Sequence, residues 1–394
     1  MAAGSPSRNL VVNEAVASGA PCSPGVVPPV THTRAGRLVL ALGIAPLVLL
    51  AVVSIVTFVD GLNPGSVGFD FRGAYLSAAH AILDGESPYS PVEGPALASQ
   101  TAYVYPPLLA YLVVPFTFFP ETVAAILAVL GVAALLAATL VVLRVRDWRC
   151  YAAVLLWAPT TNALHMASAS AGIAFAAALA WRYRSTTWPL AASIGLAAAT
   201  KVILWPLLAW TLATHRLRQT AYALLFGGGV TLVAWGGLGF AGVERYPAML
   251  RRLADLEAAD SYSLVGAMSA LGVGDGPARL VAVLLGVALL AGCVVFARRG
   301  DDLRSFTLAL AASLALTPIV WLHYLVLLLV PLAIAKPRFS AVWLVPLLLW
   351  LTPLNGNGES IQPFLPALVV AAVIAVVLMG SDPQPAPSPT AVAR

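Results

Sequence analysis

Three residues of this sequence could carry chemistry because each stands beside or inside long apolar sequence: Asp70, Lys201 and His323. Asp70 lies between Phe69 and Phe71, shortly after the first apolar stretch ends. A carboxylate between aromatic side chains near a membrane can have its proton affinity raised, as a general base requires. The position makes Asp70 a candidate general base, and a solvated loop carboxylate is the alternative.

Lys201 follows the run GLAAAT and precedes VILWP, so it interrupts otherwise continuous apolar sequence. An ionisable residue inside a membrane span is costly and marks function by default. The alternative is a lysine whose ammonium group reaches the membrane interface along its apolar stem. The best-matched functional partner of such a lysine is a phosphate.

His323 stands at the start of an apolar run, beside Trp321 and Tyr324. It either hydrogen-bonds a neighbouring helix or contacts a phosphate or hydroxyl at the outer interface. His165 is a weaker candidate, more readily explained as structural, and Arg72 could hold an anion. The sequence has no DxD motif, phosphate-cradling glycine loop or metal-ligand cluster, so we expect neither a metal nor a cofactor.

The composition of the chain indicates what kind of protein must position these residues. Of 394 residues, 60% are hydrophobic and only 10% are charged, under half the level usual in a soluble domain. The chain is therefore expected to be an all-α integral membrane protein. Its net charge of +5 is small and does not suggest a nucleic-acid partner, and its three cysteines predict no disulfide framework.

A long polar segment, residues 68–107, separates the first two apolar regions and contains Asp70 and four tyrosines. Loops of this length in compact proteins are usually functional or disordered. The aromatic content and the helix-like run SAAHAIL favour a folded cap on the membrane surface. We expect this first loop, residues 60–107, to be folded and external.

Basic residues predict the topology. Arg34 and Arg37 precede the first span, and later arginines recur at alternate turns, which places both termini and these turns in the cytoplasm. Residues 1–36 and 381–394 are expected to be disordered cytoplasmic tails around one transmembrane domain, 37–380.

The apolar segment of residues 106–120 is short and bracketed by proline, so we interpret it as interfacial or re-entrant. The pattern predicts about 12 spans, near 37–59, 122–143, 150–159, 164–181, 187–200, 202–214, 219–239, 278–297, 305–317, 323–335, 339–352 and 363–379.

Several motifs of the first loop resemble glycosyltransferase family 87. They are Asp70 with Tyr75, the segment LDGESPY with Tyr89, and Tyr105 before two prolines at the end of the loop. Later motifs agree in order: Lys201 with a following proline, SYSL at 261–264, and the segment 316–332 around His323. The resemblance extends over roughly residues 38–380.

The chain departs from the family pattern at two places. A Gly-Gln-x-Asn element keeps only Asn162, and an Asn-Gln-Ser element appears as Ser261-Tyr262-Ser263. Both positions are expected to line the sugar or acceptor pocket, so they bear on substrate choice more than on catalysis.

The resemblance implies a polytopic helical bundle of the GT-C type and a plasma-membrane enzyme that acts on the external face. The family moves mannose from a polyprenyl-monophosphate carrier to a hydroxyl of a glycolipid or lipid-linked glycan, with inversion and without a metal. Asp70 and His323 would be catalytic, and Lys201, His323 and Arg72 would bind the donor phosphate. The implied substrate pocket contains Tyr75, Tyr89, Tyr105, Asn162, His165, Ser263 and Trp321.

Two other functions fit the number of spans. A transporter or flippase of a lipid-linked or polar solute would explain the spans but not the long folded loop, and it should carry ionisable residues near mid-membrane. A non-catalytic assembly protein with a GT-C-like fold would explain the altered pocket motifs. Mannose is inherited from the family, and another hexose or a pentose is an open alternative, as are the acceptor and the oligomeric state.

Overall fold

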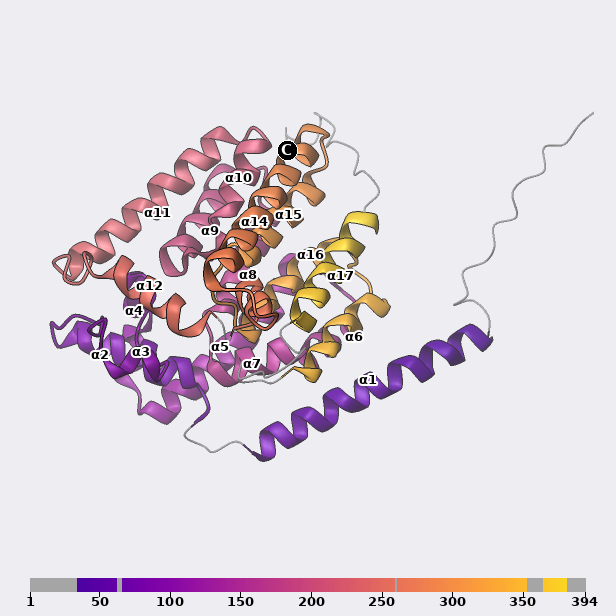
Figure 1. Ribbon diagram of the computed structural model, residues 1–394, viewed down its shortest axis with the longest axis horizontal. Helices are drawn as coiled ribbons and strands as arrows, with labels where there is room; N and C mark the ends of the chain where they lie inside the picture. Colours follow the sequence, from indigo (N-terminus) through magenta and orange to yellow (C-terminus); the bar gives the residue numbers. More distant parts are fainter. Residues whose placement is uncertain (1–33, 62–65, 259–260, 353–363, 381–394) are drawn as a thin grey trace, which may run out of the picture. The chain divides into compact units, whose positions relative to one another are not determined.

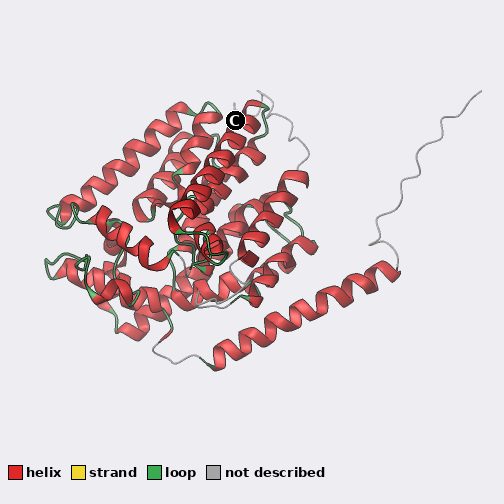
Figure 2. Cartoon of the chain, viewed as in Figure 1, coloured by secondary structure: helices red, strands yellow, loops and turns green. Residues whose placement is uncertain are grey.

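The structure is a computed structural model that describes residues 34–61, 66–258, 261–352 and 364–380. The chain divides into two compact units, Met1–Ile44 and Ala45–Arg394. All regular secondary structure in the described ranges is helical, and none of it is strand (Figure 2). The predicted tails lie outside these ranges, except that residues 34–36 already belong to the first helix.

Figure 1 shows the helices, which are short on average and interrupted by tight turns. In chain order they are α1 (Arg34–Asp60), η3 (Phe71–Leu76), α2 (Ser77–Leu83), α3 (Pro95–Ala98), α4 (Pro107–Val113), η4 (Val114–Phe118), α5 (Glu121–Val142), α6 (Trp148–Leu155), α7 (Ala158–Met166), α8 (Ser170–Arg182), α9 (Thr187–Thr200), η5 (Val202–Leu204), α10 (Pro206–Ala213), α11 (Leu217–Gly237), α12 (Tyr246–Glu257), α13 (Leu264–Ser269), α14 (Asp275–Arg298), α15 (Asp302–Ala315), η6 (Leu322–Leu328), α16 (Leu329–Ala335), η7 (Ala341–Leu351) and α17 (Phe364–Gly380).

Among the described residues, α5, α11 and α14 are each long and apolar enough to cross a bilayer. Helices α7 and α8 meet the same test only together, across a bend of 118°. Much of the remaining apolar sequence forms helices of 10–17 residues. The all-helical membrane protein is thus confirmed, whereas the count of about 12 spans stays a prediction.

Two predicted spans differ from the observed helices. The segment 164–181 is not continuous, because Ala167 ends α7 with a left-handed φ of 48° and α8 begins afresh at Ser170. The segment 150–159 contains residues 150–155 of α6 and the first two residues of α7. The eight residues of α6 rise by about 12 Å, too little to cross the hydrocarbon core.

The first loop is folded. Phe71, Tyr75 and Tyr103 are buried in one apolar cluster with residues of α4 and α5. Residues 71–76 form a π-helix, a rare conformation that occurs mostly at functional sites. The aromatic residues that argued against disorder are therefore the ones that anchor this segment.

Helices α9 and α11 approach each other closely at two glycines. A Cβ atom on Gly227 would lie 2.9 Å from the Cα atom of Gly195, whereas one on Gly228 or Gly229 would meet nothing within 4 Å. Within the Gly227–Gly229 run, Gly227 is therefore the residue that allows the close approach of the two helices.

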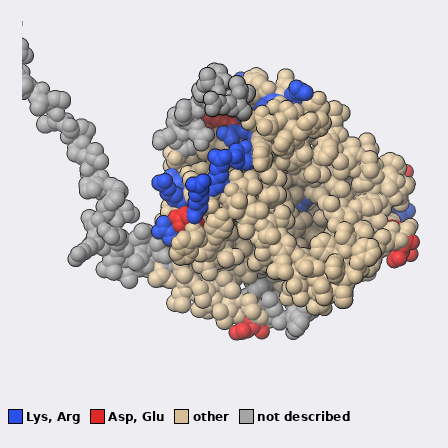
Figure 3. All heavy atoms as spheres, turned by 180° about the vertical axis from the view of Figure 1, so that it is seen from behind, with Lys and Arg blue, Asp and Glu red and all other residues tan. Residues whose placement is uncertain are grey.

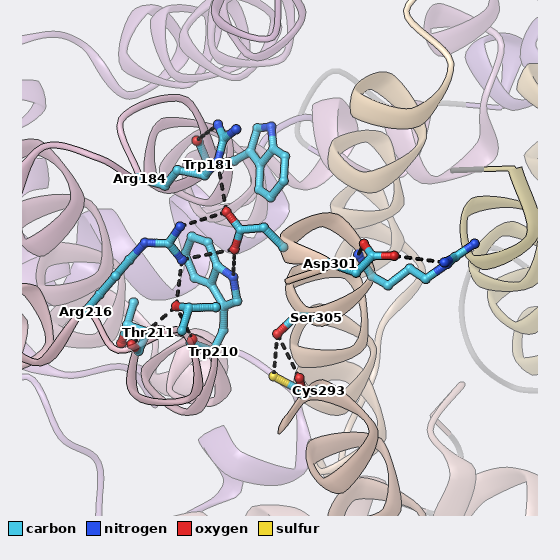
Figure 4. Close-up of polar contacts among 11 residues, drawn as sticks. Trp181, Arg184, Trp210, Thr211, Arg216, Cys293, Asp301 and Ser305 are labelled. Atoms are coloured by element: carbon cyan, nitrogen blue, oxygen red, sulfur yellow. Dashed lines mark hydrogen bonds and ion pairs between the residues drawn. The ribbon is translucent and has the colours of Figure 1, made fainter. Parts of the chain in front are cut away.

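Arginines of two predicted cytoplasmic turns meet at one carboxylate (Figure 4). Asp302 accepts hydrogen bonds from Arg184 Nε at 3.0 Å and Arg216 Nη2 at 2.7 Å, and Trp210 Nε1 donates to it at 2.8 Å. These contacts join the ends of α8, α10, α11 and α15 at one place. Figure 3 shows lysines and arginines gathered in a band beside a broad uncharged surface.

Candidate active site

Asp70, Asn162 and His323 line one cavity of about 320 Å³. They come from three parts of the chain: the residue before η3, the middle of α7 and the start of η6. Trp321 and His165 line the same cavity. Tyr105 lines it as well, so the structure brings together six of the residues that the sequence had singled out.

Asp70 and His323 face each other inside this cavity. Asp70 Oδ2 lies 3.9 Å from His323 Nε2, and the Tyr75 hydroxyl lies 3.5 Å from the same carboxylate oxygen. The Asp70 side chain is 20% exposed and that of His323 is 4% exposed. The carboxylate is thus accessible from the cavity, while the imidazole supports it from within the protein.

Asn162 orients the imidazole. His323 Nδ1 lies 3.0 Å from Asn162 Oδ1, an oxygen that can only accept, so Nδ1 carries a proton. In neutral His323 the lone pair of Nε2 then points toward the side of Asp70. Nε2 has no hydrogen-bond partner among the described residues, which leaves it able to take or share a proton.

The environment of Asp70 suits a base. The residue lies outside the candidate membrane spans, and burial raises its pKa from 3.8 to about 6. The positive charge of Lys201 and the hydrogen bond from Tyr75 act in the opposite direction and limit that rise. Such a carboxyl group is ionised at neutral pH and still basic enough to accept a proton.

Lys201 is buried behind the cavity. Its Nζ lies 3.4 Å from Ser170 Oγ and 3.4 Å from the centroid of the Tyr324 ring, with the Tyr105 ring at 5.3 Å. Tyr105 and Tyr324 line the cavity, but Lys201 does not. The lysine is therefore 7% exposed and close to the other candidates, separated from the cavity by two aromatic rings.

Arg72 does not reach the cavity. Its Nη1 pairs with Glu121 Oε1 at 2.8 Å, and its Nε donates to the carbonyl oxygen of Val67 at 2.8 Å. It lines a separate pocket of about 450 Å³ that shares only Phe69 with the first. An anion-binding role for Arg72 would belong to that pocket.

Tyr89 and Ser263 also lie outside the cavity lining. Tyr89 stacks on Trp235, with ring centroids 5.1 Å apart, and its hydroxyl donates to the Tyr105 carbonyl oxygen at 2.9 Å. Ser263 caps α13 by accepting from the Gly266 N–H at 3.1 Å. Both contacts hold backbone that surrounds the site, so these two residues support the pocket from outside.

Glu257 and Gln100 line the cavity and were missed from the sequence. Gln100 Nε2 donates to Glu257 Oε2 at 2.7 Å, across 157 residues of chain. Helical spacing could have revealed Glu257 from the sequence. Met249, Leu253 and Glu257 are four residues apart and lie on one face of α12. Glu257 therefore shares the apolar face, where a carboxylate is unexpected.

A second, apolar groove of about 640 Å³ lies beside this site. It follows α8 from Gly172 to Tyr183 and α9 from Pro189 to Thr200, with α4 and α5 residues as its other wall. The 13 residues of α8 give the groove a length of about 20 Å. Tyr75 also lines it, so this residue touches the groove on one side and Asp70 on the other.

The fold and site define a helical membrane protein with a carboxylate and a histidine in a cavity beside an apolar groove. The family model described as glycosyltransferase family 87 matches residues 103–322, more than half of the 394 residues. The chain belongs to glycosyltransferase family 87 and is a membrane glycosyltransferase.

The matched region contains Asn162, Lys201 and Trp321, begins after Asp70 and ends immediately before His323. The comparisons with curated proteins and with solved structures gave no match.

Proposed function

We propose that this glycosyltransferase moves a sugar, mannose by analogy with its family, from a polyprenyl-monophosphate carrier to a hydroxyl of a glycolipid or lipid-linked glycan. One observation carries the proposal: Tyr75 lines the apolar groove while its hydroxyl lies 3.5 Å from Oδ2 of Asp70, which lines the neighbouring cavity. A lipid chain and a reacting sugar can thus occupy adjoining spaces with the candidate base at the junction.

The groove suits the lipid part of the donor. Its walls are almost entirely apolar side chains of α4, α5, α8 and α9, and it is about 640 Å³ in volume. The polyprenyl chain already lies in apolar surroundings in the bilayer, so the groove would hold several isoprene units by van der Waals packing and shape rather than by burial from water. The rest of a long polyprenyl chain would continue into the bilayer.

Lys201 is placed to receive the phosphate between the two spaces. Its neighbour Thr200 lines the groove, and the rings of Tyr105 and Tyr324 that contact its ammonium group line the cavity. A phosphate oxygen would offer a charge-assisted hydrogen bond that a ring face cannot match. We infer that the phosphate binds Lys201 and Ser170, with some movement of the tyrosine rings.

The transfer step follows from Asp70. Its carboxylate accepts the proton of the acceptor hydroxyl, whose oxygen attacks the anomeric carbon of the donor sugar. The bond from that carbon to the phosphate oxygen breaks, and polyprenyl phosphate leaves with the bonding electron pair beside Lys201. Direct displacement inverts the anomeric centre, so a β-linked donor would give an α-glycoside.

His323 has a more specific role than the phosphate contact expected from the sequence. Its Nε2 faces Asp70 Oδ2 at 3.9 Å, and Asn162 holds its other nitrogen. In this arrangement the imidazole can share the proton that Asp70 receives. We therefore propose that His323 supports the base, while Lys201 supports the leaving group.

We propose an external active site, about 12 spans and cytoplasmic termini. Helix α8 begins at Ser170, next to Lys201, and ends at Arg182, next to the arginine cluster around Asp302. The site and the basic turns therefore lie about 20 Å apart along one helix. If the basic turns are cytoplasmic, the site opens toward the opposite face of the plasma membrane.

The two alternatives are weaker on this geometry. A transporter needs an alternating path through mid-membrane, whereas the ionisable residues here lie near the two ends of α8, the candidate site at Ser170 and the arginine cluster beyond Arg182. A non-catalytic protein would bind carrier lipid without transferring sugar. Both alternatives could use the groove for a lipid chain, and sugar transfer distinguishes the enzyme from either of them.

The test measures sugar transfer in isolated membranes that contain either the wild-type protein or the Asp70→Asn variant. The membranes receive radiolabelled polyprenyl-phosphate mannose or, in separate assays, other polyprenyl-phosphate sugars. The substitution keeps the shape and removes the basic carboxylate, so transfer should fall at least ~100-fold. Binding of polyprenyl phosphate should be retained. Asp84→Asn, an exposed loop carboxylate, is the matched control. Wild-type turnover in the Asp70 variant would refute the assignment.

A further inference from the structure

Glu257 is a buried carboxylate in the cavity that the proposed transfer step does not use. We propose that Glu257, held by Gln100, binds the acceptor saccharide by accepting a hydrogen bond from a hydroxyl other than the one that reacts. The inference rests on the proposed function, because it assigns one wall of the same cavity to the acceptor.

The placement of Glu257 is the first support. The residue is 6% exposed at the end of α12, and Gln100 Nε2 donates to its Oε2 at 2.7 Å. Both side chains line the same cavity as Asp70, but they come from α12 and from the turn after α3. The cavity therefore has two carboxylates on separate elements, of which Asp70 adjoins the groove through Tyr75.

The backbone at Gln100 is the second support. Gln100 has a φ of 59°, in the left-handed region that few residues other than glycine adopt. Such strain is tolerated where the surrounding structure holds it, often at binding sites. Here it accompanies the hydrogen bond that fixes the Glu257 carboxylate.

The chemistry of the wall fits a sugar. A carboxylate oxygen can accept more than one hydrogen bond, and a saccharide presents several hydroxyl donors at short spacing. Leu253 and Trp321 add apolar and aromatic surface to the same cavity, as a sugar ring requires for its C–H faces. Glu257 would thus select the orientation of the acceptor and, with it, the hydroxyl presented to Asp70.

The test uses the full-length protein in nanodiscs and octyl α-D-mannopyranoside, with its monodeoxy derivatives, as acceptor probes. Glu257→Gln keeps the shape and can still hydrogen-bond Gln100, but it loses the charge. Binding of the parent glycoside should weaken roughly ten- to a hundredfold. In transfer assays KM for the glycoside should rise by a similar factor, with a smaller change in kcat.

The deoxy derivatives locate the contact. The wild-type protein should lose affinity for one derivative in particular, and Glu257→Gln should bind that derivative and the parent glycoside equally. Asp255→Asn is the matched control, because Asp255 lies on the same helix and pairs with Arg279 outside the cavity lining. It should bind every glycoside as the wild type does.

Each other outcome overturns the inference. If the wild type binds no glycoside, or if Glu257→Gln binds all of them normally, this wall does not recognise a saccharide. Equal weakening for all derivatives with a lowered melting temperature would indicate a structural link between α12 and the loop. Lost kcat with unchanged binding would make Glu257 part of the chemistry instead. The proposed function fails separately, if the wild type transfers no sugar from any polyprenyl-phosphate donor while glycoside binding can still be measured.

Discussion

The Asp70 carboxyl group lies 3.5 Å from the Tyr75 hydroxyl and 3.9 Å from the His323 imidazole, and the charge of the more distant Lys201 acts on it as well. Burial of the carboxyl group has the largest effect on its pKa and raises it to about 6. Because the raised value lies below neutral pH, the group is mostly ionised there and becomes protonated as the pH falls through about 6.

The rate of sugar transfer should follow this protonation. Below pH 6 the base form of Asp70 declines, so kcat/KM should fall about tenfold for each further pH unit, while it should be level above the midpoint. Transfer in nanodiscs at saturating acceptor and limiting donor, measured across this range, gives the midpoint. A rate that stays constant well below that pH would argue against Asp70 as the base.

Removal of the Tyr75 hydroxyl should move the midpoint upward. The hydrogen bond from Tyr75 stabilises the ionised carboxylate and lowers its pKa, so Tyr75→Phe should require a higher pH for full activity. Tyr222→Phe, which packs against Trp188 away from the cavity, is the control and should leave the profile unchanged. A downward shift in Tyr75→Phe would contradict the assigned hydrogen bond.

At this scale the sequence singled out Asp70 and His323, because polar residues beside apolar runs stand out, and the family resemblance added Asn162. It could not separate them from Arg72, whose partner Glu121 lies 49 residues away. Only the folded chain shows that Arg72 is already paired and that Lys201 sits behind two tyrosine rings. Glu257 was not recognised from the sequence, because charged residues are common on an amphipathic helix such as α12.

The elements that carry the site depend on a few close contacts between helices. Lys201 follows directly after α9, and the packing of α9 on α11 at Gly195 and Gly227 fixes the position of that helix. At the opposite end, Asp302 joins α8, α10, α11 and α15. Both contacts are therefore expected to contribute to stability.

Gly227→Ala should destabilise the protein. The new Cβ would lie 2.9 Å from Gly195 Cα, which forces the helices apart at a cost of about 1–3 kcal/mol. Gly228→Ala meets nothing within 4 Å and should leave stability equal or higher, because alanine favours a helix. The melting temperatures of the two variants in one detergent give the comparison, and equal values would count against close packing at Gly227.

Loss of the Asp302 carboxylate should also lower the melting temperature. Asp302→Asn would weaken hydrogen bonds from two arginines that are 18% and 31% exposed, and we expect a loss of about 1–3 kcal/mol. Asp255→Asn removes an ion pair whose side chains are about half exposed, so it should cost about 0–1 kcal/mol. A smaller effect at Asp302 than at Asp255 would mean that the arginine cluster does not stabilise the fold.

The sequence predicted the helical class and most of the apolar segments, but not where helices break. Ala167 interrupts a predicted span, yet neither glycine nor proline marks the position. Helix α7 packs mainly against η6, whereas α8 packs mainly against α5 and α9. Hydropathy and basic turns do not encode these tertiary contacts.

At the scale of the whole molecule, the membrane topology determines which side of the membrane the site faces. The arginine cluster and the site lie at opposite ends of α8, so labelling of one exposed residue near each end determines the orientation. Ser99 and Ser185 are both exposed and suit this purpose.

In a Cys22→Ser background, Ser99→Cys should react with a membrane-impermeant thiol reagent in intact cells, and Ser185→Cys should not. Cys150 and Cys293 are buried and give a low background. Ser185→Cys should react after the cells are opened, which confirms that it is accessible. The reverse labelling pattern would invert the topology and place the site in the cytoplasm.

The π-helix that follows Asp70 has a consequence for the length of this segment. Its wider turn accommodates about one residue more than an α-helical turn of the same height. Without that additional residue, the segment 71–76 would close into an ordinary turn, and Asp70 would rotate by about 100° relative to α2. The carboxylate then could not meet both Tyr75 and His323. The length of this short helix is therefore as restricted as its composition, and a single deletion within it is a more severe change than most substitutions.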